Sequence, residues 1–277
     1  MPCTKPERGA KRASDHGNHR YRICRLNPRI EPYAADLAVR LRSMVSGELL
    51  ETACGTGILT RALAARLPAA VAITATDLNE PMLDFARLQP GGGRVAWRQA
   101  DAQALPFSDQ TFDAVVCQFG VMFFPDKQRA YREVFRVLKP GGRFLFSVWD
   151  RVETNDLSHI VHTTVGGMFP DDPPMFLERT PTGYHDISRI RADLAGAGFA
   201  ESTVDTRKMP CRTPSARHPA LGLIQGSPLG AEVIARDPSG LDKAVEAATK
   251  AITERFGPGP IEASMQAHIL TATRPPR

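Results

Sequence analysis

The residues with the clearest capacity for chemistry stand in LLETACGTG, at positions 49–57. A carboxylate, Glu51, precedes a short glycine turn, and a helical run follows. Glycine turns between a strand and a helix commonly hold nucleotides. A dinucleotide fingerprint, however, needs three glycines in the spacing G-x-G-x-x-G, and Thr60 occupies the third position. Because a carboxylate beside a pyrophosphate adds negative charge to negative charge, Glu51 favours a cationic ligand.

S-Adenosylmethionine fits this description, because it carries an amino group and a sulfonium and has no phosphate. Its own carboxylate suits the N-terminus of the helix that begins near Gly57. Asp77 is a candidate acceptor for both ribose hydroxyls and Asp101 for the adenine amino group, and Met82 is a candidate to pack on the purine ring. Each of these residues alone is more often a cap or turn residue. Together, at the ends of successive strands, they favour a binding site.

The elements that must position these residues follow an alternating order. Apolar runs predict strands at 47–53, 71–77, 94–101, 112–120 and 143–149, and helical periodicity predicts helices at 30–45, 57–67, from Pro81, and at 126–138. Lys139 to Gly142 has the residues of a type II turn. Continuous apolar strands between amphipathic helices predict a parallel sheet covered on both faces. Ligands of such sheets bind beyond the carboxyl ends of the strands, so one rim should carry Glu51, Asp77, Asp101 and Gln118.

The second half of the chain is less regular. The proline and glycine content of 151–182 argues against a long helix, a helix is expected over 187–197, and strands are expected at 201–209 and 264–272. We therefore expect an unstructured basic tail at 1–20, an S-adenosylmethionine-binding core at 21–150, a cap insert at 151–182, and the rest of the core at 183–277 with a partly helical insert at 213–260. Both inserts are candidates for a cap over the rim.

Composition narrows the class of protein and its partners. Hydrophobic and charged residues make up 42% and 23% of the chain, as in ordinary soluble proteins. Because it contains no apolar run near the roughly 20 residues of a membrane span and no signal-peptide pattern at its start, we expect no membrane span and a cytoplasmic location. The net charge of +5 is spread without a dense basic run, which argues against a nucleic-acid partner. The five cysteines lack zinc or redox spacing, so no metal is expected. The oligomeric state is left open.

The chain resembles the class I S-adenosylmethionine-dependent methyltransferases, and within them the small-molecule group (methyltransferase type 11) that includes the ubiquinone and menaquinone biosynthesis enzymes. The resemblance covers about residues 30–150 in unbroken order and rests on LLETACGTG (49–57), TDLNEPML (76–83), ADAQALPFSDQTFDAVVCQFG (100–120) and REVFRVLKPGGRFLFSVW (132–149). It implies an α/β fold: a Rossmann-like, doubly wound, seven-stranded sheet, mostly parallel with an antiparallel last strand, plus the cap inserts.

The resemblance also implies which residues bind the cofactor. It assigns the methionine part to Glu51, Ala53, Gly55, Gly57 and Gln118, the ribose and adenine to Asp77 and Met82, and the adenine edge to Asp101 and Ala102, and it adds Thr56 and Leu78 to the cofactor-binding set. One departure is Ala53, where many relatives have glycine. Because alanine is small, little effect is expected.

The implied activity is transfer of a methyl group from S-adenosylmethionine to a small, largely apolar organic acceptor at an O, N or C atom, with S-adenosylhomocysteine as product. In-line displacement mainly needs alignment and exclusion of water, so the protein need not supply a nucleophile. Catalytic residues stay unassigned. The candidates for a base that faces the acceptor are His159, His162 and His185, and Tyr33 is a candidate to contact or cover the cofactor; each is also an ordinary surface or packing residue. His268, within an expected strand, is the least suited.

The acceptor pocket has two readings. The apolar insert residues suit a pocket for an apolar acceptor, but a cap also needs a core of its own; they are Met168, Phe169, Met175, Phe176, Leu221, Leu223 and Ile224.

Three other functions compete with methylation of a small molecule. A nucleic-acid methyltransferase is suggested by Asp172–Met175 (DPPM) and Pro210–Cys211, both far from the expected catalytic positions. A non-catalytic cofactor-binding protein and a nicotinamide-dependent oxidoreductase are the others.

Overall fold

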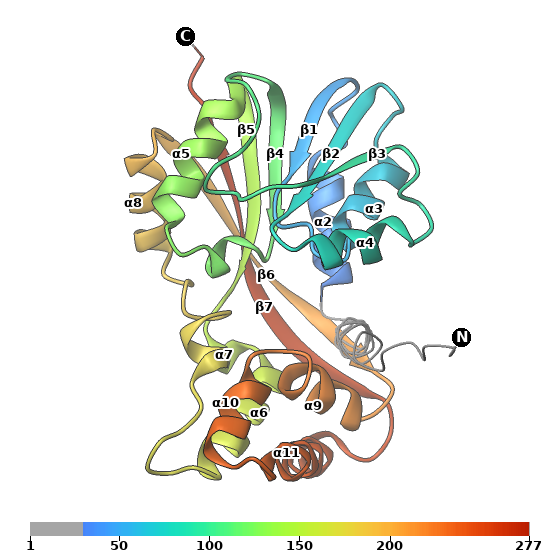
Figure 1. Cartoon of the computed structure of the whole chain (residues 1–277), viewed down its shortest axis with the longest axis vertical. Coiled ribbons are helices and arrows are strands. Elements are labelled where there is room, and N and C mark those ends of the chain that lie inside the picture. The colour runs from blue at the N-terminus through green and yellow to red at the C-terminus, as the bar shows by residue number, and fades with distance from the viewer. Residues whose placement is uncertain (1–29, 277) are drawn as a thin grey trace, which may run out of the picture.

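Over residues 30–276, which the computed structural model describes, the chain forms a seven-stranded sheet in the order β3-β2-β1-β4-β5-β7-β6 (Figure 1). The strands are β1 (Gly47–Glu51), β2 (Val71–Asp77), β3 (Val95–Gln99), β4 (Phe112–Gln118), β5 (Leu138–Trp149), β6 (Glu201–Thr213) and β7 (Ile261–Thr273). Strands β1 to β5 pair in parallel, whereas β7 runs antiparallel to both β5 and β6. The predicted Rossmann-like fold is therefore confirmed. The expected tail at 1–20 lies outside the described residues.

The sheet is covered by helices on both faces. These are α2 (Glu31–Arg40), α3 (Ile58–Arg66), α4 (Glu80–Arg87), α5 (Lys127–Val137) and α8 (Ile187–Gly196). From β1 the chain moves along the sheet through β2 to β3, and from β4 it moves the other way to β5. Because such crossovers are right-handed, α3 and α4 lie on one face and α5 on the other. Local sequence sets the start of α5, because Asp126 caps this helix by accepting from the Arg129 amide at 2.8 Å.

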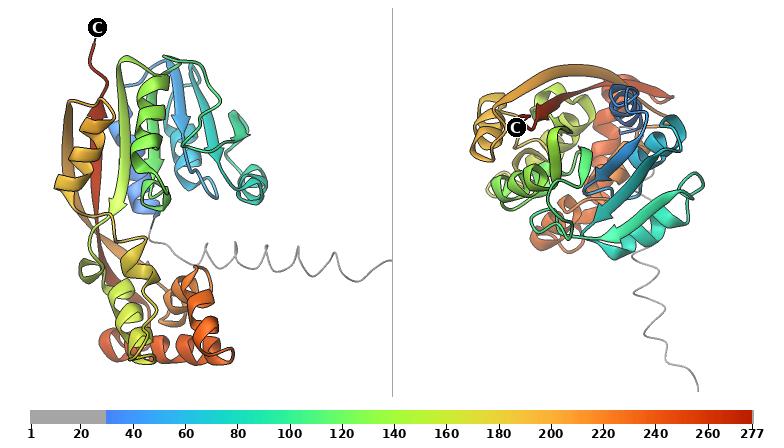
Figure 2. Two further views of the ribbon diagram at one scale, coloured as in Figure 1. Left: turned by 60° about the vertical axis from the view of Figure 1, so that its left-hand side comes forward. Right: turned by 90° about the horizontal axis from the view of Figure 1, so that it is seen from above.

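A helical lobe lies beyond one end of the sheet (Figures 1 and 2). It contains α6 (Asp156–Gly167), α7 (Phe176–Arg179), α9 (Arg217–Ile224), α10 (Leu229–Arg236) and α11 (Gly240–Phe256), and two single-turn helices, η1 (Val121–Phe123) and η2 (Val152–Thr154), follow β4 and β5. Strands β6 and β7 stay paired along their whole length, while β5 accompanies β7 only from Arg143 to Trp149. The rest of the β6–β7 ribbon therefore joins the sheet to the helical lobe.

One local sequence prediction was wrong. Helix α6 occupies part of a stretch judged too rich in proline and glycine, because the run GGMFPDDPPMF starts only at its last turn and the residues before it bury Val161 and Val165.

The turn predicted at Lys139 to Gly142 lies inside β5, which begins at Leu138. Gly141 has a φ of +78°, as the third position of a type II turn requires, so the turn is an irregularity within the strand.

The predicted division into domains stays a prediction. Its two inserts, 151–182 and 213–260, carry the helices α6, α7, α9, α10 and α11 of the helical lobe. Within the part of the chain that the structure describes, no helix is both long and apolar enough to cross a membrane.

Candidate active site

A cavity of about 560 Å³ lies where β1, β2, β3 and β4 end. All the predicted cofactor-binding residues except Gly57 line it: Glu51, Ala53, Gly55, Thr56, Asp77, Leu78, Met82, Asp101, Ala102 and Gln118. Gly57 lies directly beside them as the N-cap of α3, with a φ of +74°. A Cβ at this position would lie 2.8 Å from the Trp97 ring, so only glycine fits the turn.

Glu51 is the last residue of β1 and is almost fully buried, with 1% of its surface exposed. Its Oε2 atom has no hydrogen-bond partner among the described residues. Burial, with a smaller contribution from the nearby Asp77 carboxylate, raises the pKa of the Glu51 carboxyl to about 8. A buried carboxyl without a partner is costly, and a cationic ligand in the cavity would supply the missing charge. The residues present therefore fit the cationic end of S-adenosylmethionine.

Asp77 ends β2 and is held in place by two backbone amides. Its Oδ2 accepts from Gly55 at 2.8 Å, and its Oδ1 accepts from Asn79 at 2.9 Å. These bonds tie the glycine turn after β1 to the end of β2. Because each carboxylate oxygen has two lone pairs, both can still accept a hydroxyl from a ligand.

Two side-chain amides in the lining, those of Gln103 and Gln118, connect neighbouring loops. Asp101 Oδ1 accepts from the backbone amide of Gln103 at 2.8 Å, and Gln103 Oε1 accepts from the Asp126 amide at 2.9 Å. Gln118 Nε2 donates to the Ile30 carbonyl at 2.7 Å. The loop after β4 is thereby joined to the loop after β3, and β4 to the start of α2.

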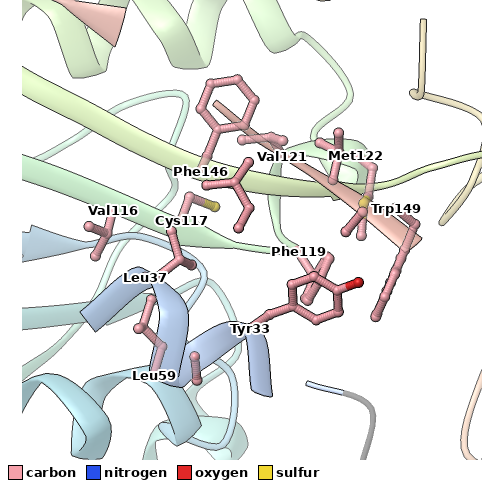
Figure 3. Packing of buried hydrophobic residues seen from close by; sticks show 14 of the residues in the cluster. Tyr33, Leu37, Leu59, Val116, Cys117, Phe119, Val121, Met122, Phe146 and Trp149 are labelled. Carbon is pink, nitrogen blue, oxygen red and sulfur yellow. The ribbon is translucent and has the colours of Figure 1, made fainter. Parts of the chain in front are cut away.

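Tyr33 lies in an aromatic cluster instead of lining the cavity (Figure 3). Its ring is fully buried and meets Phe119 edge-on at 5.3 Å and Trp149 at 5.5 Å. Phe119 and Trp149 stack at 3.8 Å. The Tyr33 hydroxyl donates to the carbonyls of Arg207 and Met265, at 2.8 and 3.2 Å. Tyr33 thus supports Phe119, which does line the cavity.

The candidate histidines also lie outside the residues that line this cavity. His159 and His162 belong to α6, and His162 Nε2 is 3.1 Å from the Glu178 carboxylate. His185 Nδ1 is 2.7 Å from the Thr182 carbonyl. His268 lies between Asp150 and Thr206, and burial lowers its pKa below the ordinary range.

Most of the apolar insert residues form the interior of the helical lobe, whereas Met175 lines a separate cavity together with Val152 and His185. Phe176, Leu223 and Ile224 are buried in the core, and Met168, Phe169 and Leu221 pack against it. None of them lines the 560 Å³ cavity. Of the two readings of these residues, the structure therefore favours a core of the lobe itself.

The two fragments that suggested a nucleic-acid methyltransferase, at 172–175 and 210–211, contain residues whose contacts stabilise the fold. Asp172 forms an ion pair with Arg236 of α10 at 3.0 Å, and its carbonyl accepts from the same guanidinium. Cys211 is buried within β6. Neither residue lines the cavity.

Sequence reasoning missed several residues that line the cavity: Ile30, Cys54, Ile58, Leu59, Asn79, Ala100, Gln103, Phe119, Gly120, Phe123, Phe124, Pro125 and Pro228. Phe119 and Gly120 directly follow the predicted Gln118, so their position at a strand end was a usable signal. Pro228 is the N-cap of α10 in the helical lobe, and nothing in the local sequence pointed to it.

The fold and the cavity together define a class of protein: a doubly wound α/β protein whose cavity, at the carboxyl ends of the strands, is lined by carboxyl groups and a two-glycine turn. Comparisons with known proteins agree. Residues 50–146 match the model of a family described as "Methyltransferase domain". The ubiquinone/menaquinone biosynthesis C-methyltransferase UbiE of Idiomarina loihiensis is 38% identical over 175 residues, which cover 58% of this chain and 69% of that protein.

Solved structures show the same fold. The YcgJ protein of Bacillus subtilis covers 88% of this chain and 99% of its own, with a TM-score of 0.57 and 18% identity. A phosphoethanolamine N-methyltransferase of Haemonchus contortus, in complex with S-adenosylhomocysteine, covers 87% of this chain and 52% of its own, with a TM-score of 0.52 and 15% identity. This chain belongs to the S-adenosylmethionine-dependent methyltransferases, in the group that includes the UbiE-like enzymes. It is a methyltransferase of the small-molecule type, and its cofactor is S-adenosylmethionine.

Proposed function

We propose that this methyltransferase methylates a small, largely apolar organic acceptor, and that donor and acceptor meet in the 560 Å³ cavity. The observation that carries the proposal is Glu51, a buried carboxyl at the end of β1 whose Oε2 lacks a partner. A cationic nucleoside supplies that partner, whereas a pyrophosphate would bring its negative charge to a cavity that holds three carboxyl groups: Glu51, Asp77 and Asp101.

Each predicted cofactor-binding residue has a role in this proposal. Glu51 pairs with the cofactor's amino group, Asp77 accepts from the ribose hydroxyls, and Asp101 accepts from the adenine amino group. Leu78, Met82 and Ala102 pack against the purine, and Gln118 holds the methionine end. The turn residues Ala53, Gly55, Thr56 and Gly57 let the backbone approach the cofactor closely.

Reactivity then depends on alignment more than on acid–base chemistry. When bound, S-adenosylmethionine supplies an electrophilic methyl group whose bond to sulfur breaks, leaving the electron pair on sulfur, as the bond to the acceptor atom forms. The chain's own contribution is to fix the donor in one orientation, through Asp77 and Gln118, and to exclude water with Phe119 and Phe124. Holding two reactants in line replaces a bimolecular encounter and is worth many powers of ten in rate.

The test is a turnover assay of the full chain. Incubation with methyl-labelled S-adenosylmethionine and a panel of phenols, amines and activated carbon acids should yield S-adenosylhomocysteine and a methylated product, both detected by mass spectrometry. DNA and RNA belong in the same panel at low and high salt, because binding to phosphates falls steeply with salt. Product formation with nucleic acid alone would contradict the proposal. Binding of S-adenosylhomocysteine with no turnover on any acceptor would favour a non-catalytic cofactor-binding protein.

A further inference from the structure

Phe119 has a backbone conformation that its residue type rarely adopts. Its φ is +53°, in the left-handed region where the Cβ of an L-residue crowds the following carbonyl oxygen. The residue directly follows Gln118, the last residue of β4, and directly precedes Gly120, and all three line the 560 Å³ cavity. The conformation at Phe119 therefore decides the direction in which the chain leaves β4 and runs along the cavity.

Three aromatic rings in mutual contact hold Phe119 in this conformation (Figure 3). The Phe119 and Trp149 rings stack with their centroids 3.8 Å apart and their planes 7° from parallel. The Tyr33 ring meets both edge-on, with its centroid 5.3 Å from that of Phe119 and 5.5 Å from that of Trp149. We name these three residues the aromatic clamp. Stacked and edge-to-face rings attract each other beyond the area that they bury, so the clamp opposes rotation of Phe119 out of its strained conformation.

The clamp is anchored by elements outside the cavity. Trp149 is the last residue of β5, Tyr33 belongs to α2, and neither of them lines the cavity. Strand β5 also supplies Ser147, whose carbonyl and hydroxyl oxygens accept from the Phe119 amide at 3.1 and 3.2 Å. The Tyr33 hydroxyl is bound to two carbonyls of the β6–β7 ribbon. Helix α2, strand β5 and the ribbon thus converge on one residue of the cavity lining.

Resting on the proposed function, we infer that Trp149 is a positioning residue of the methyltransferase, which acts on the bound cofactor through Phe119. Its ring keeps Phe119 left-handed, and this keeps the Gln118 side chain at the methionine end of the cofactor. A reaction that depends on aligning two molecules is sensitive to small displacements of the groups that bind them. A tryptophan that only filled the core would affect stability and leave ligand affinity unchanged.

The test compares two apolar substitutions: Trp149→Phe, which keeps a ring that can stack, and Trp149→Leu, which does not. S-Adenosylhomocysteine is titrated calorimetrically into each folded full chain, and so is adenosine, which lacks the methionine end. Trp149→Leu should weaken binding of S-adenosylhomocysteine about tenfold, a difference of roughly 1.4 kcal/mol, and change adenosine affinity by less than about twofold. Trp149→Phe should stay within about threefold of the wild type for both ligands.

Phe199→Leu is the matched control, because Phe199 is buried against Phe135 and Phe144 and lies outside the cavity. It should lower the thermal midpoint and leave both affinities unchanged. Wild-type affinity of Trp149→Leu for S-adenosylhomocysteine would overturn the inference, because the ring would then be core packing alone. Equal loss of both ligands would overturn it as well, since the effect would not lie at the methionine end. So would equal losses in Trp149→Phe and Trp149→Leu, since ring stacking would not be involved.

The route through Phe119 has a test of its own. Glycine adopts a positive φ at little steric cost, so a chain with Phe119→Gly depends less on the clamp to hold its backbone. In that background, Trp149→Leu should change the affinity for S-adenosylhomocysteine by less than about twofold. The full loss seen with Phe119 in place would overturn the inference, because Trp149 would then act by another route.

Failure of the proposed function gives a different result. If neither S-adenosylhomocysteine nor adenosine binds the wild-type chain, the proposed cofactor site is wrong and the positioning role is rejected with it. If both ligands bind the wild type and the Trp149 variants bind them equally well, the cofactor site stands and only the positioning role is rejected.

Discussion

At the residue scale, the buried Glu51 carboxyl lowers the stability of the free protein, and in the proposed function it also binds the amino group of the cofactor. A carboxyl with an ordinary pKa of 4.5 is held at about 8 by burial at the end of β1. Below the ordinary pKa the group is protonated in both folded and unfolded chains, so it costs little. As the pH rises toward 8, the unfolded chain loses this proton while the folded chain keeps it, so the free energy of unfolding falls. With about 1.4 kcal/mol per pKa unit, the loss approaches about 4–5 kcal/mol at pH 8 and above.

Glu51→Gln should therefore stabilise the free protein at alkaline pH. We expect its thermal midpoint near pH 8.5 to exceed that of the wild type by several degrees, at about 2 °C per kcal/mol, and the difference to shrink as the pH falls below about 5. The same variant should bind S-adenosylhomocysteine more weakly, because the neutral amide lacks the charge that pairs with the amino group. Glu254→Gln, at an exposed position on α11, is the control and should leave both quantities unchanged. A lower midpoint for Glu51→Gln at pH 8.5 would contradict this account.

At the element scale, the turns after β1 and β4 are pressed together. A Cβ at Gly120 would lie 2.6 Å from both the Ala53 Cβ and the Cys117 Sγ. Ala53 itself has a φ of +51°, and Phe119 one of +53°. Left-handed backbone costs a residue other than glycine roughly 1–2 kcal/mol, so alanine at position 53 is more strained than its small size suggested.

Gly120→Ala should destabilise the chain by about 1–3 kcal/mol, because neither neighbouring atom is the end of a long flexible side chain. Ala53→Gly should cause little or no loss, since relief of strain offsets the extra freedom of the unfolded chain. In the double variant Ala53→Gly/Gly120→Ala, part of the loss should be recovered, because one of the two clashes is gone. Denaturant unfolding measures all three, and Gly259→Ala, where a Cβ meets nothing within 4 Å, is the control. Wild-type stability of Gly120→Ala would show that the two turns move apart freely.

At the scale of the whole molecule, ligand binding should register as global stability. S-Adenosylhomocysteine at about 100 times its dissociation constant adds roughly 2.7 kcal/mol to the free energy of unfolding, which raises the thermal midpoint by about 5 °C. Reduced nicotinamide dinucleotide in the same excess should leave the midpoint unchanged, because the described lining of the cavity offers its pyrophosphate three carboxyl groups and no lysine, arginine or histidine. A shift with the nicotinamide compound alone would mean that the two-glycine turn binds a dinucleotide.

The whole molecule also shows how far sequence reasoning reaches. Strands β1 to β4 and the rim residues Glu51, Asp77 and Asp101 were predictable, because short-range apolar runs and strand ends determine them. The reach of Pro228 into the cavity was not predictable. It depends on packing of α11 against α6 and α9 and on the long β6–β7 pairing, which are contacts distant in sequence. Tyr33 shows the same limit, because its helical spacing suited both a ligand contact and the core position that the structure gives it.

The most direct test of the central claim is a calorimetric titration of S-adenosylhomocysteine into the wild type and Asp77→Asn. Losing a charged hydrogen-bond partner costs about 1.5–3 kcal/mol, so the dissociation constant should rise roughly 10- to 150-fold. Asp84→Asn, at an exposed position on α4, is the control and should bind as the wild type does. Thermal unfolding of each variant without ligand verifies that the fold is intact. A folded Asp77→Asn that binds with wild-type affinity would contradict the claim that the carboxylates at the strand ends hold the cofactor.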